Sequence, residues 1–218
     1  MKSEVTYTSD IGLFTVNRSI KNSCDHRTSF CDTYCYNFKL YKVYKDMAKK
    51  DVRNDSYWEH LKQNPEALKP VFDAKKRDSA RVRFMSRGEA FKDLTDVYAV
   101  REMLLADPDR LYWIPTRAWH SATLRAAIEG EIMPLKNAAL NASLDPSDTD
   151  SDWESLEESG WNVMFFGDDS RTETPSGKRM FQCPKTHKKL KGHCAICKAG
   201  CFSVSQIDRQ VSVHLSQH

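Results

Sequence analysis

The middle of the chain alternates short apolar runs with stretches of helical periodicity. Residues 80–85 alternate apolar and polar side chains, which predicts a strand. The elements predicted after it are a helix over 97–104, a strand over 111–114, a helix over 121–128, a strand at about 138–142, a helix over 152–158 and a strand over 161–166. Strands and helices in turn indicate βα units around a mostly parallel sheet.

This order of elements predicts an α/β fold in the form of an incomplete or distorted β/α barrel of the TIM type. An open doubly wound sheet is the alternative. Residues 36–78 are polar and aromatic, and we expect them to be helical. We therefore predict one domain, 1–218, with three parts: an N-terminal cysteine group and helices over 12–78, a β/α core over 79–170 and a C-terminal cysteine-rich segment over 171–218.

The composition is that of a globular protein that can form a core without disulfides. The chain has 218 residues, of which 40% are hydrophobic, with 33 Lys and Arg against 30 Asp and Glu. A chain of this length buries about 70% of its unfolded surface, and a net charge of +3 does not by itself indicate a nucleic-acid partner. The apolar runs are shorter than the roughly 18 residues of a membrane span, and no apolar stretch follows Lys2 as it would in a secretory signal. We expect a cytoplasmic protein without a membrane partner.

Seven cysteines lie near the two ends of the chain and form two groups. The first group is Cys24, Cys31 and Cys35, and the second is Cys183, Cys194, Cys197 and Cys201. In a reducing cytoplasm such clusters favour metal binding over disulfides, because ordinary thiols stay reduced while a metal stabilises the thiolate. All seven cysteines are therefore predicted metal ligands.

The second group has four thiols close enough in sequence to bind one metal centre. It has one C-x2-C pair, Cys194 and Cys197, with Cys201 four residues on and Cys183 followed by proline. A structural zinc ribbon usually has two separate C-x2-C pairs, so this spacing favours an iron-sulfur cluster of the 4Fe-4S type. Zinc is the alternative, and unligated cysteines are the third interpretation.

The first group has three thiols, which is an informative number for an iron-sulfur cluster. A four-iron cluster held by Cys24, Cys31 and Cys35 leaves one iron open to a substrate, a cofactor or a fourth ligand such as His26. Radical S-adenosylmethionine enzymes use such an open iron with C-x3-C-x2-C spacing, of which this group has the C-x3-C part. Two alternatives stay open: Cys183 completes this group, or the three cysteines are buried and unreactive. The chain is accordingly predicted to hold one or two clusters.

Polar residues follow the predicted strands at their carboxyl ends, where α/β proteins place their chemistry. Arg87 and Glu89 follow the first strand, Thr116 and Arg117 the second, and Asp145 the third. We expect Arg87, Thr116 and Arg117 to bind an anionic ligand, and Glu89 or Asp145 to move protons in redox or radical chemistry. Helix capping and solvated loops are the competing explanation.

A second functional hypothesis is a binding module whose iron-sulfur or zinc centres are structural. Residues 178–198 contain seven Lys or Arg and no Asp or Glu, and the helical region from Lys39 to Arg53 combines Lys with Tyr. Such surfaces fit the phosphates and bases of a nucleic acid, and a host protein is the other partner of this hypothesis.

Several segments together resemble the phage and plasmid family called gene product 88. The resemblance runs from about Gly12 to Cys201 and is carried by the cysteine group ending in Cys35-Tyr36, by Ser86–Phe91, Tyr112–Trp119 and Ala142–Asp145, and by the four closing cysteines. The chain departs from the family pattern at Cys24-Asp25, where members tend to have Cys-Pro, and at Gly88-Glu89, where they tend to have Gly-Asp. The resemblance implies a phage-type origin, hence a host cytoplasm, and a cysteine-bound iron-sulfur centre. It implies no particular activity.

Overall fold

The structure is a computed structural model that describes residues 2–9, 11–187, 194–204 and 210–216. Eight strands in this part of the chain form one sheet, in the order β1-β2-β3-β4-β5-β6-β8-β7. The strands are β1 Thr6–Thr8, β2 Leu13–Val16, β3 Arg81–Phe84, β4 Leu111–Thr116, β5 Ala138–Leu144, β6 Asn162–Gly167, β7 Phe181–Gln182 and β8 Ser212–Ser216. Strand β1 is antiparallel to β2, and every other neighbouring pair is parallel. The predicted α/β class with a mostly parallel sheet is confirmed.

The strand order tests the two predicted arrangements of the sheet. Strands β2 to β6 are neighbours in chain order, as in a β/α barrel, without the reversal of order found in a doubly wound sheet. In the described residues, however, β1 and β7 stand at opposite edges of the sheet and do not pair with each other. A barrel is therefore not confirmed.

The helices connect the strands, and several begin at a side-chain cap. The α-helices are α1 Ile20–Ser23, α2 Ser29–Tyr34, α3 Tyr36–Val43, α4 Met47–Gln63, α5 Leu68–Asp73, α6 Leu94–Ala106, α7 Ala122–Glu131 and α8 Asp150–Glu158. Short 3-10 helices cover Pro65–Ala67 and Ala118–His120. Asp93, Ser121 and Thr149 each accept a hydrogen bond from a backbone N–H of the first helical turn, which is why α6, α7 and α8 begin where they do. None of the described helices is long and apolar enough to cross a membrane.

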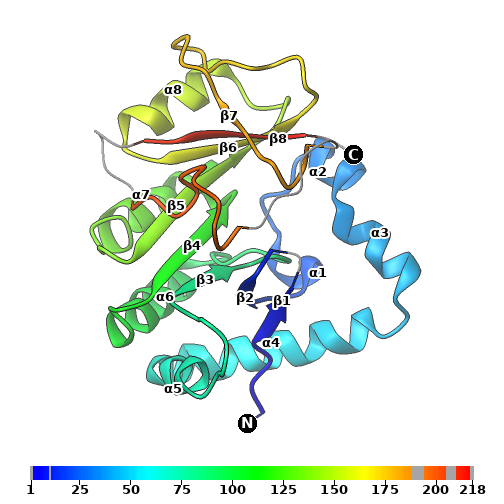
Figure 1. Ribbon diagram of the computed structural model, residues 1–218, viewed down its shortest axis with the longest axis vertical. Helices are drawn as coiled ribbons and strands as arrows, with labels where there is room; N and C mark the ends of the chain where they lie inside the picture. Colours follow the sequence, from blue (N-terminus) through cyan, green and yellow to red (C-terminus); the bar gives the residue numbers. More distant parts are fainter. Residues whose placement is uncertain (1, 10, 188–193, 205–209, 217–218) are drawn as a thin grey trace.

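The main hydrophobic core lies between the helices and one face of the sheet. Successive side chains of a strand point to opposite faces, so Val82 and Phe84 of β3 face this core with Ile114 of β4. Trp58 of α4 and Leu104 of α6 are fully buried against them. Figure 1 shows α5, α6 and α7 along one side of the sheet, with α1 and α2 near the end to which the parallel strands point.

The opposite face of the sheet carries a smaller apolar cluster made of Ile11, Leu13, Trp113 and Met164. We call it the cysteine face, because Cys194 and Cys201 pack against it together with Ala195 and Phe202. The C-terminal segment 194–203 therefore covers the face of the sheet that the helices leave uncovered.

Candidate functional site

A cavity of about 210 Å³ lies where the carboxyl ends of β3, β4 and β5 meet the loop after β2. All three N-terminal cysteines line it, and so does His26. The other predicted pocket residues that line it are Arg87, Glu89, Thr116 and Arg117. We call this cavity the cysteine pocket. Its volume lies below the roughly 300–1,000 Å³ of sites for drug-sized organic ligands, so it suits a compact group.

The cysteine loop, residues 17–35, is fastened to the sheet by Thr28. The Thr28 hydroxyl accepts a hydrogen bond from the Cys31 backbone N–H at 3.1 Å and donates one to Asp145 Oδ2 at 2.6 Å. Cys31 Sγ lies 3.9 Å from the same carboxylate oxygen. Thr28 thus begins α2 and holds its first cysteine at the carboxyl end of β5.

Gly88 permits the turn after β3 to lie directly against the cysteine loop. Its φ is +84°, and a Cβ atom built there would stand 2.7 Å from the carbonyl oxygen of Arg18. The Arg18 backbone N–H donates to the Arg87 carbonyl at 3.1 Å, and the Glu89 N–H donates to the Ser23 hydroxyl at 2.9 Å. The segment Ser86–Glu89 therefore needs glycine at this position for both conformation and space.

The buried carboxylate of Glu89 joins the turns that follow β3 and β4. Its Oε1 accepts hydrogen bonds from the Ala90 and Phe91 N–H groups and from the Thr116 hydroxyl, and its Oε2 accepts one from the Arg117 N–H. Burial raises the pKa of Glu89, while these hydrogen bonds act in the opposite direction. In the structure Glu89 holds the pocket wall together, and its predicted catalytic role stays a prediction.

The two predicted arginines line the cysteine pocket, but each is already paired with carboxylates. Arg87 Nη2 lies 2.7 Å from Asp51 Oδ1. Arg117 lies 2.9 Å from Asp145 Oδ2 through Nη1 and 2.9 Å from Asp148 Oδ2 through Nη2. Because these partners neutralise the guanidinium charges, the expected attraction of the pocket for an anion is weaker than the sequence indicates.

Asp145, the second catalytic candidate, lies beneath the cysteine loop. Burial by itself raises the pKa of Asp145, but hydrogen bonds from Ser147 and Thr28 and the charge of Arg117 outweigh it and lower the pKa. This carboxylate therefore stays ionised near neutral pH, where it serves as an acceptor rather than a proton donor.

His26 brings an unsatisfied ring nitrogen to the pocket wall, where Nε of Arg83, Arg87 and Arg117 also lacks a hydrogen bond to a described residue. Its Nε2 is buried and makes no hydrogen bond to a described residue. Burial and the nearby charge of His120 lower the pKa of His26, which favours the neutral imidazole. A neutral imidazole with a free nitrogen is the form that binds metals.

None of the four cysteines of the second group lines the pocket, although Arg83, which does line it, acts on Cys194 and Cys201 through its charge. Cys183 directly follows β7, and Cys194 and Cys201 pack on the cysteine face. Burial raises the pKa of Cys201 to about 12, with further increases from the thiolates of the other three members of its group. The charge of Cys183 contributes to this increase, and Cys183 does not line the cysteine pocket.

One thiol of the first group and two of the second are poor nucleophiles. Burial raises the pKa of Cys24 to about 12, that of Cys194 to about 11 and that of Cys201 to about 12. These three thiols stay protonated at neutral pH, which disfavours nucleophilic attack by them. Among the described residues, no three His, Cys, Asp or Glu side chains are arranged to hold a single metal ion.

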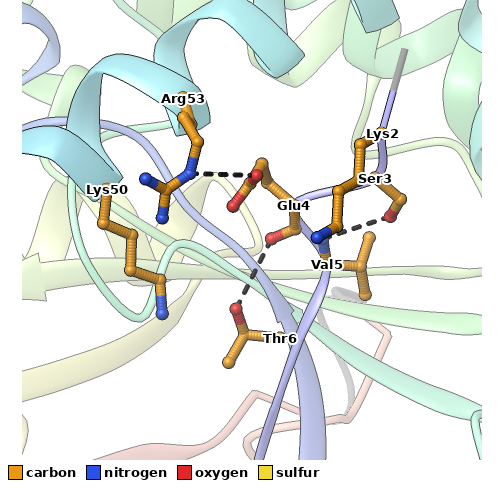
Figure 2. Close-up of a pocket in the computed structure, with 7 residues that line it drawn as sticks. All are labelled: Lys2, Ser3, Glu4, Val5, Thr6, Lys50 and Arg53. Atoms are coloured by element: carbon orange, nitrogen blue, oxygen red, sulfur yellow. Dashed lines mark hydrogen bonds and ion pairs between the residues drawn. The ribbon is translucent and has the colours of Figure 1, made fainter.

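A second, larger hollow of about 540 Å³ lies between the N-terminal strand and α4 (Figure 2). Lys2, Ser3, Glu4, Val5, Thr6, Lys50 and Arg53 line it. Arg53 Nε is paired with Glu4 Oε1 at 3.2 Å, and the Ser3 and Thr6 hydroxyls bond to neighbouring backbone groups. None of the residues predicted for the site lines this hollow, and the cysteine pocket is the better candidate.

Sequence reasoning missed several residues that shape the pocket. Thr28 carried a usable signal, because a Thr before a short helix is a common cap. Asp51 and Asp148 neutralise the two arginines. Their roles could not be predicted from the sequence, because their contacts join elements far apart in the chain.

Fold and site define an α/β protein with a cysteine-lined pocket at the carboxyl ends of a mostly parallel sheet. The family model described as Gene product 88 matches residues 4–202. The chain belongs to the Gene product 88 family, as its sequence resemblance implied. Comparisons with curated proteins and with solved structures find no match.

Proposed function

We propose that this is an iron-sulfur protein whose Cys24, Cys31 and Cys35 hold a four-iron cluster with one iron facing the cysteine pocket. The observation that carries the proposal is that three thiols from one loop line a single cavity beside polar groups from the ends of three parallel strands. The core, with β2 to β6 in chain order, is on this proposal an incomplete β/α barrel that presents the loop at its carboxyl end.

The residues present fit such a cluster. Thiolates are the ligands of iron-sulfur clusters. A single zinc ion requires its ligands to converge on one point at about 2.3 Å, whereas each cysteine of a cluster binds a different iron. The unsatisfied Nε2 of His26 supplies a candidate fourth ligand in the same wall. A cluster bound here would supply one-electron transfer.

The remaining residues of the pocket orient the cysteines and limit access to water. Thr28 and Asp145 hold Cys31 in place, and the Ser23 hydroxyl lies 4.0 Å from Cys24 Sγ while it accepts the Glu89 N–H. Phe166 and Met85 contribute apolar wall. The pocket would therefore admit a small ligand to the open iron, with the neutralised arginines favouring a compact polar group over a highly charged one.

Anaerobic purification followed by an absorption spectrum and by iron, sulfide and zinc counts tests the proposal. We expect broad absorption near 400 nm, and a loss of about four irons per chain in the triple variant C24S/C31S/C35S. Thr33→Ser, on the exposed side of α2, is the matched control and should keep its iron. Iron content that is unchanged in the triple variant would refute the proposal. Reductive cleavage of S-adenosylmethionine then separates radical chemistry from simple electron transfer.

One observation favours the binding module as a second candidate. Val43 and Tyr44, at the connection of α3 and α4, are 69% and 57% exposed beside Lys42 and Lys45. Exposed aromatic and basic side chains together suit nucleic acid. Binding of single-stranded DNA that weakens with salt and in K42E/K45E would support it. The other predicted surface, 178–198, lies partly outside the described residues.

A further inference from the structure

One arginine of the cysteine pocket has no acidic partner in the part of the chain that the structure describes. The arginines that line the pocket are Arg27, Arg83, Arg87 and Arg117. Three of them lie within 2.9 Å of a carboxylate oxygen, in the pairs Arg27–Asp32, Arg87–Asp51 and Arg117–Asp145. Arg83 forms no ion pair with a described residue, and its Nε donates no hydrogen bond to one.

We propose that Arg83 is the residue of the cysteine pocket that binds the ligand, and that this ligand is a small molecule with a single carboxylate. The inference deepens the proposed function and rests on it for the open iron beside which the ligand binds. The binding of the carboxylate itself involves only side chains of the protein.

Arg83 belongs to a strand, whereas the other three arginines follow strands or lie in the cysteine loop. It is in β3, in register with Thr15 of β2 and Trp113 of β4. Because side chains alternate along a strand, Arg83 lies on the opposite face from Val82 and Phe84, which belong to the main core. The cysteine face therefore continues into the pocket at Arg83, and two neighbouring strands hold its backbone in place.

The guanidinium of Arg83 is oriented by an aromatic ring. Its Cζ lies 4.4 Å from the centroid of the Trp113 ring, which is a cation–π contact. Trp113 is only 4% exposed and packs in the apolar cluster of the cysteine face. The contact fixes the plane of the guanidinium and leaves its charge in place. Arg83 is thus a positioned cation whose charge is available to a ligand.

The hydrogen-bonding capacity of Arg83 also requires an acceptor. A guanidinium has five N–H donors. The side chain is half-buried, and its buried Nε has no acceptor among the described residues. A buried donor without an acceptor destabilises the folded state. A ligand oxygen bound at Arg83 would offset this cost.

The other charges of the pocket define the charge of the ligand. The remaining three arginines are paired, and the carboxyl group of Glu89 lies in the same wall. One unpaired guanidinium compensates one negative charge, so a phosphate dianion would leave a second charge uncompensated. The fork of an arginine also matches the two oxygens of a carboxylate. The pocket of about 210 Å³ is shared with the proposed cluster, so the rest of the ligand must be small.

Stabilisation of the purified full-length protein by acetate tests the proposal. A ligand that binds the native state raises the midpoint of thermal unfolding, and the concentration dependence of the shift gives the affinity. We expect acetate to raise the midpoint relative to chloride at the same ionic strength. We expect Arg83→Gln to weaken acetate binding by roughly 10-fold or more, and Arg83→Lys to weaken it less, because lysine keeps the charge and lacks the fork.

Arg81→Gln is the matched control. It removes the same charge from the same strand, but Arg81 is exposed and does not line the pocket, so this variant should bind acetate as the wild type does. Equal shifts in Arg83→Gln and the wild type would overturn the proposal, and so would a wild type that acetate does not stabilise. A larger shift with inorganic phosphate than with acetate would overturn the assignment to a carboxylate.

Chemical modification of the wild-type chain gives a readout that requires no variant to fold. Phenylglyoxal reacts with guanidinium groups, and peptide mass spectrometry measures the rate at each arginine. We expect Arg83 to react faster than the paired Arg87 and Arg117, and acetate to slow its reaction. An unchanged rate at Arg83 in saturating acetate would overturn the proposal.

Iron and sulfide counts on the same wild-type sample separate this inference from the proposed function. Acetate binding by protein whose N-terminal cysteines hold no iron would refute the proposed function and support the role of Arg83. Protein that holds the pocket cluster but does not bind acetate would support the proposed function and refute the role of Arg83.

Discussion

Single residues decide how closely the loops of the pocket approach one another. Gly88 has a positive φ and stands against the Arg18 backbone, and the neighbouring Met85 also has a positive φ, of 57°. A residue other than Gly, Asn or Asp is uncommon in that region. The turn after β3 is thus strained where it forms the pocket wall, which is typical of functional sites.

Substitution of Gly88 tests this close approach. We expect Gly88→Ala to lower the free energy of unfolding by about 1–3 kcal/mol, because alanine is strained at this φ and its Cβ meets the Arg18 carbonyl. Urea denaturation measures the loss. Gly130→Ala is the control: Gly130 lies within α7 with open space around it, so alanine should stabilise by up to about 1 kcal/mol. Equal effects of the two substitutions would contradict the interpretation.

Thr28 links the cysteine loop to the sheet, and its loss should be visible in the bound cluster. We expect Thr28→Val to weaken cluster retention by roughly 10- to 100-fold, because Cys31 loses its cap and its connection to Asp145. Iron released to a chelator over time measures the effect. The matched control is Thr33→Val, since the Thr33 hydroxyl bonds only within α2. Retention equal to wild type in Thr28→Val would show that the cap does not position Cys31.

At the scale of elements, α8 depends on its first turn. The Thr149 hydroxyl and the Asp152 carboxylate form a reciprocal capping box. We expect Thr149→Ala to lower the free energy of unfolding by about 1 kcal/mol, as measured by urea denaturation. Ser151→Ala, exposed in the same turn, should have almost no effect.

The same capping box should depend on pH. The hydrogen bond from Thr149 lowers the pKa of Asp152 below its unfolded value of about 3.9. The stabilisation is therefore complete above that unfolded pKa and disappears as the pH falls through the folded pKa. We expect the difference in unfolding free energy between wild type and Thr149→Ala to shrink from pH 7 to pH 3. A difference that stays constant between pH 7 and pH 3 would show that the carboxylate does not contribute.

At the scale of the whole molecule, the two faces of the sheet are stabilised in different ways. The helix face has an extensive apolar core of buried side chains, and none of the cysteines belongs to it. The cysteine face has four core residues, and Cys194 and Cys201 pack against them. The first face has an extensive core of its own, whereas the second is covered by segment 194–203.

On the proposed function, removal of the cluster should loosen the cysteine loop. We expect a chelator to raise amide hydrogen exchange in residues 17–35, while β3 to β6 and α6 to α8 remain protected. Exchange followed by mass spectrometry checks this. If chelation raised amide exchange throughout the chain, the core on the helix face would not be stable without the metal.

The central βα elements could be predicted from the sequence because their signals are local. The alternation around Val82 and the caps at Ser121 and Thr149 act over a few residues, and β3 to β6 were found close to their predicted positions. Strands β1, β2, β7 and β8 were not predicted. Strands β2 and β8 pair with β3 and β6, which lie far away in the chain.

The sequence by itself determined the α/β class, the two cysteine groups and the residue types at the carboxyl ends of the strands. The tertiary structure decided that Cys24, Cys31 and Cys35 line one cavity, and that carboxylates from distant segments neutralise Arg87 and Arg117. The physical reason is the separation along the chain between the residues that interact. Periodicity and caps depend on neighbouring residues, but ion pairs and shared ligands depend on which distant segments meet when the sheet assembles.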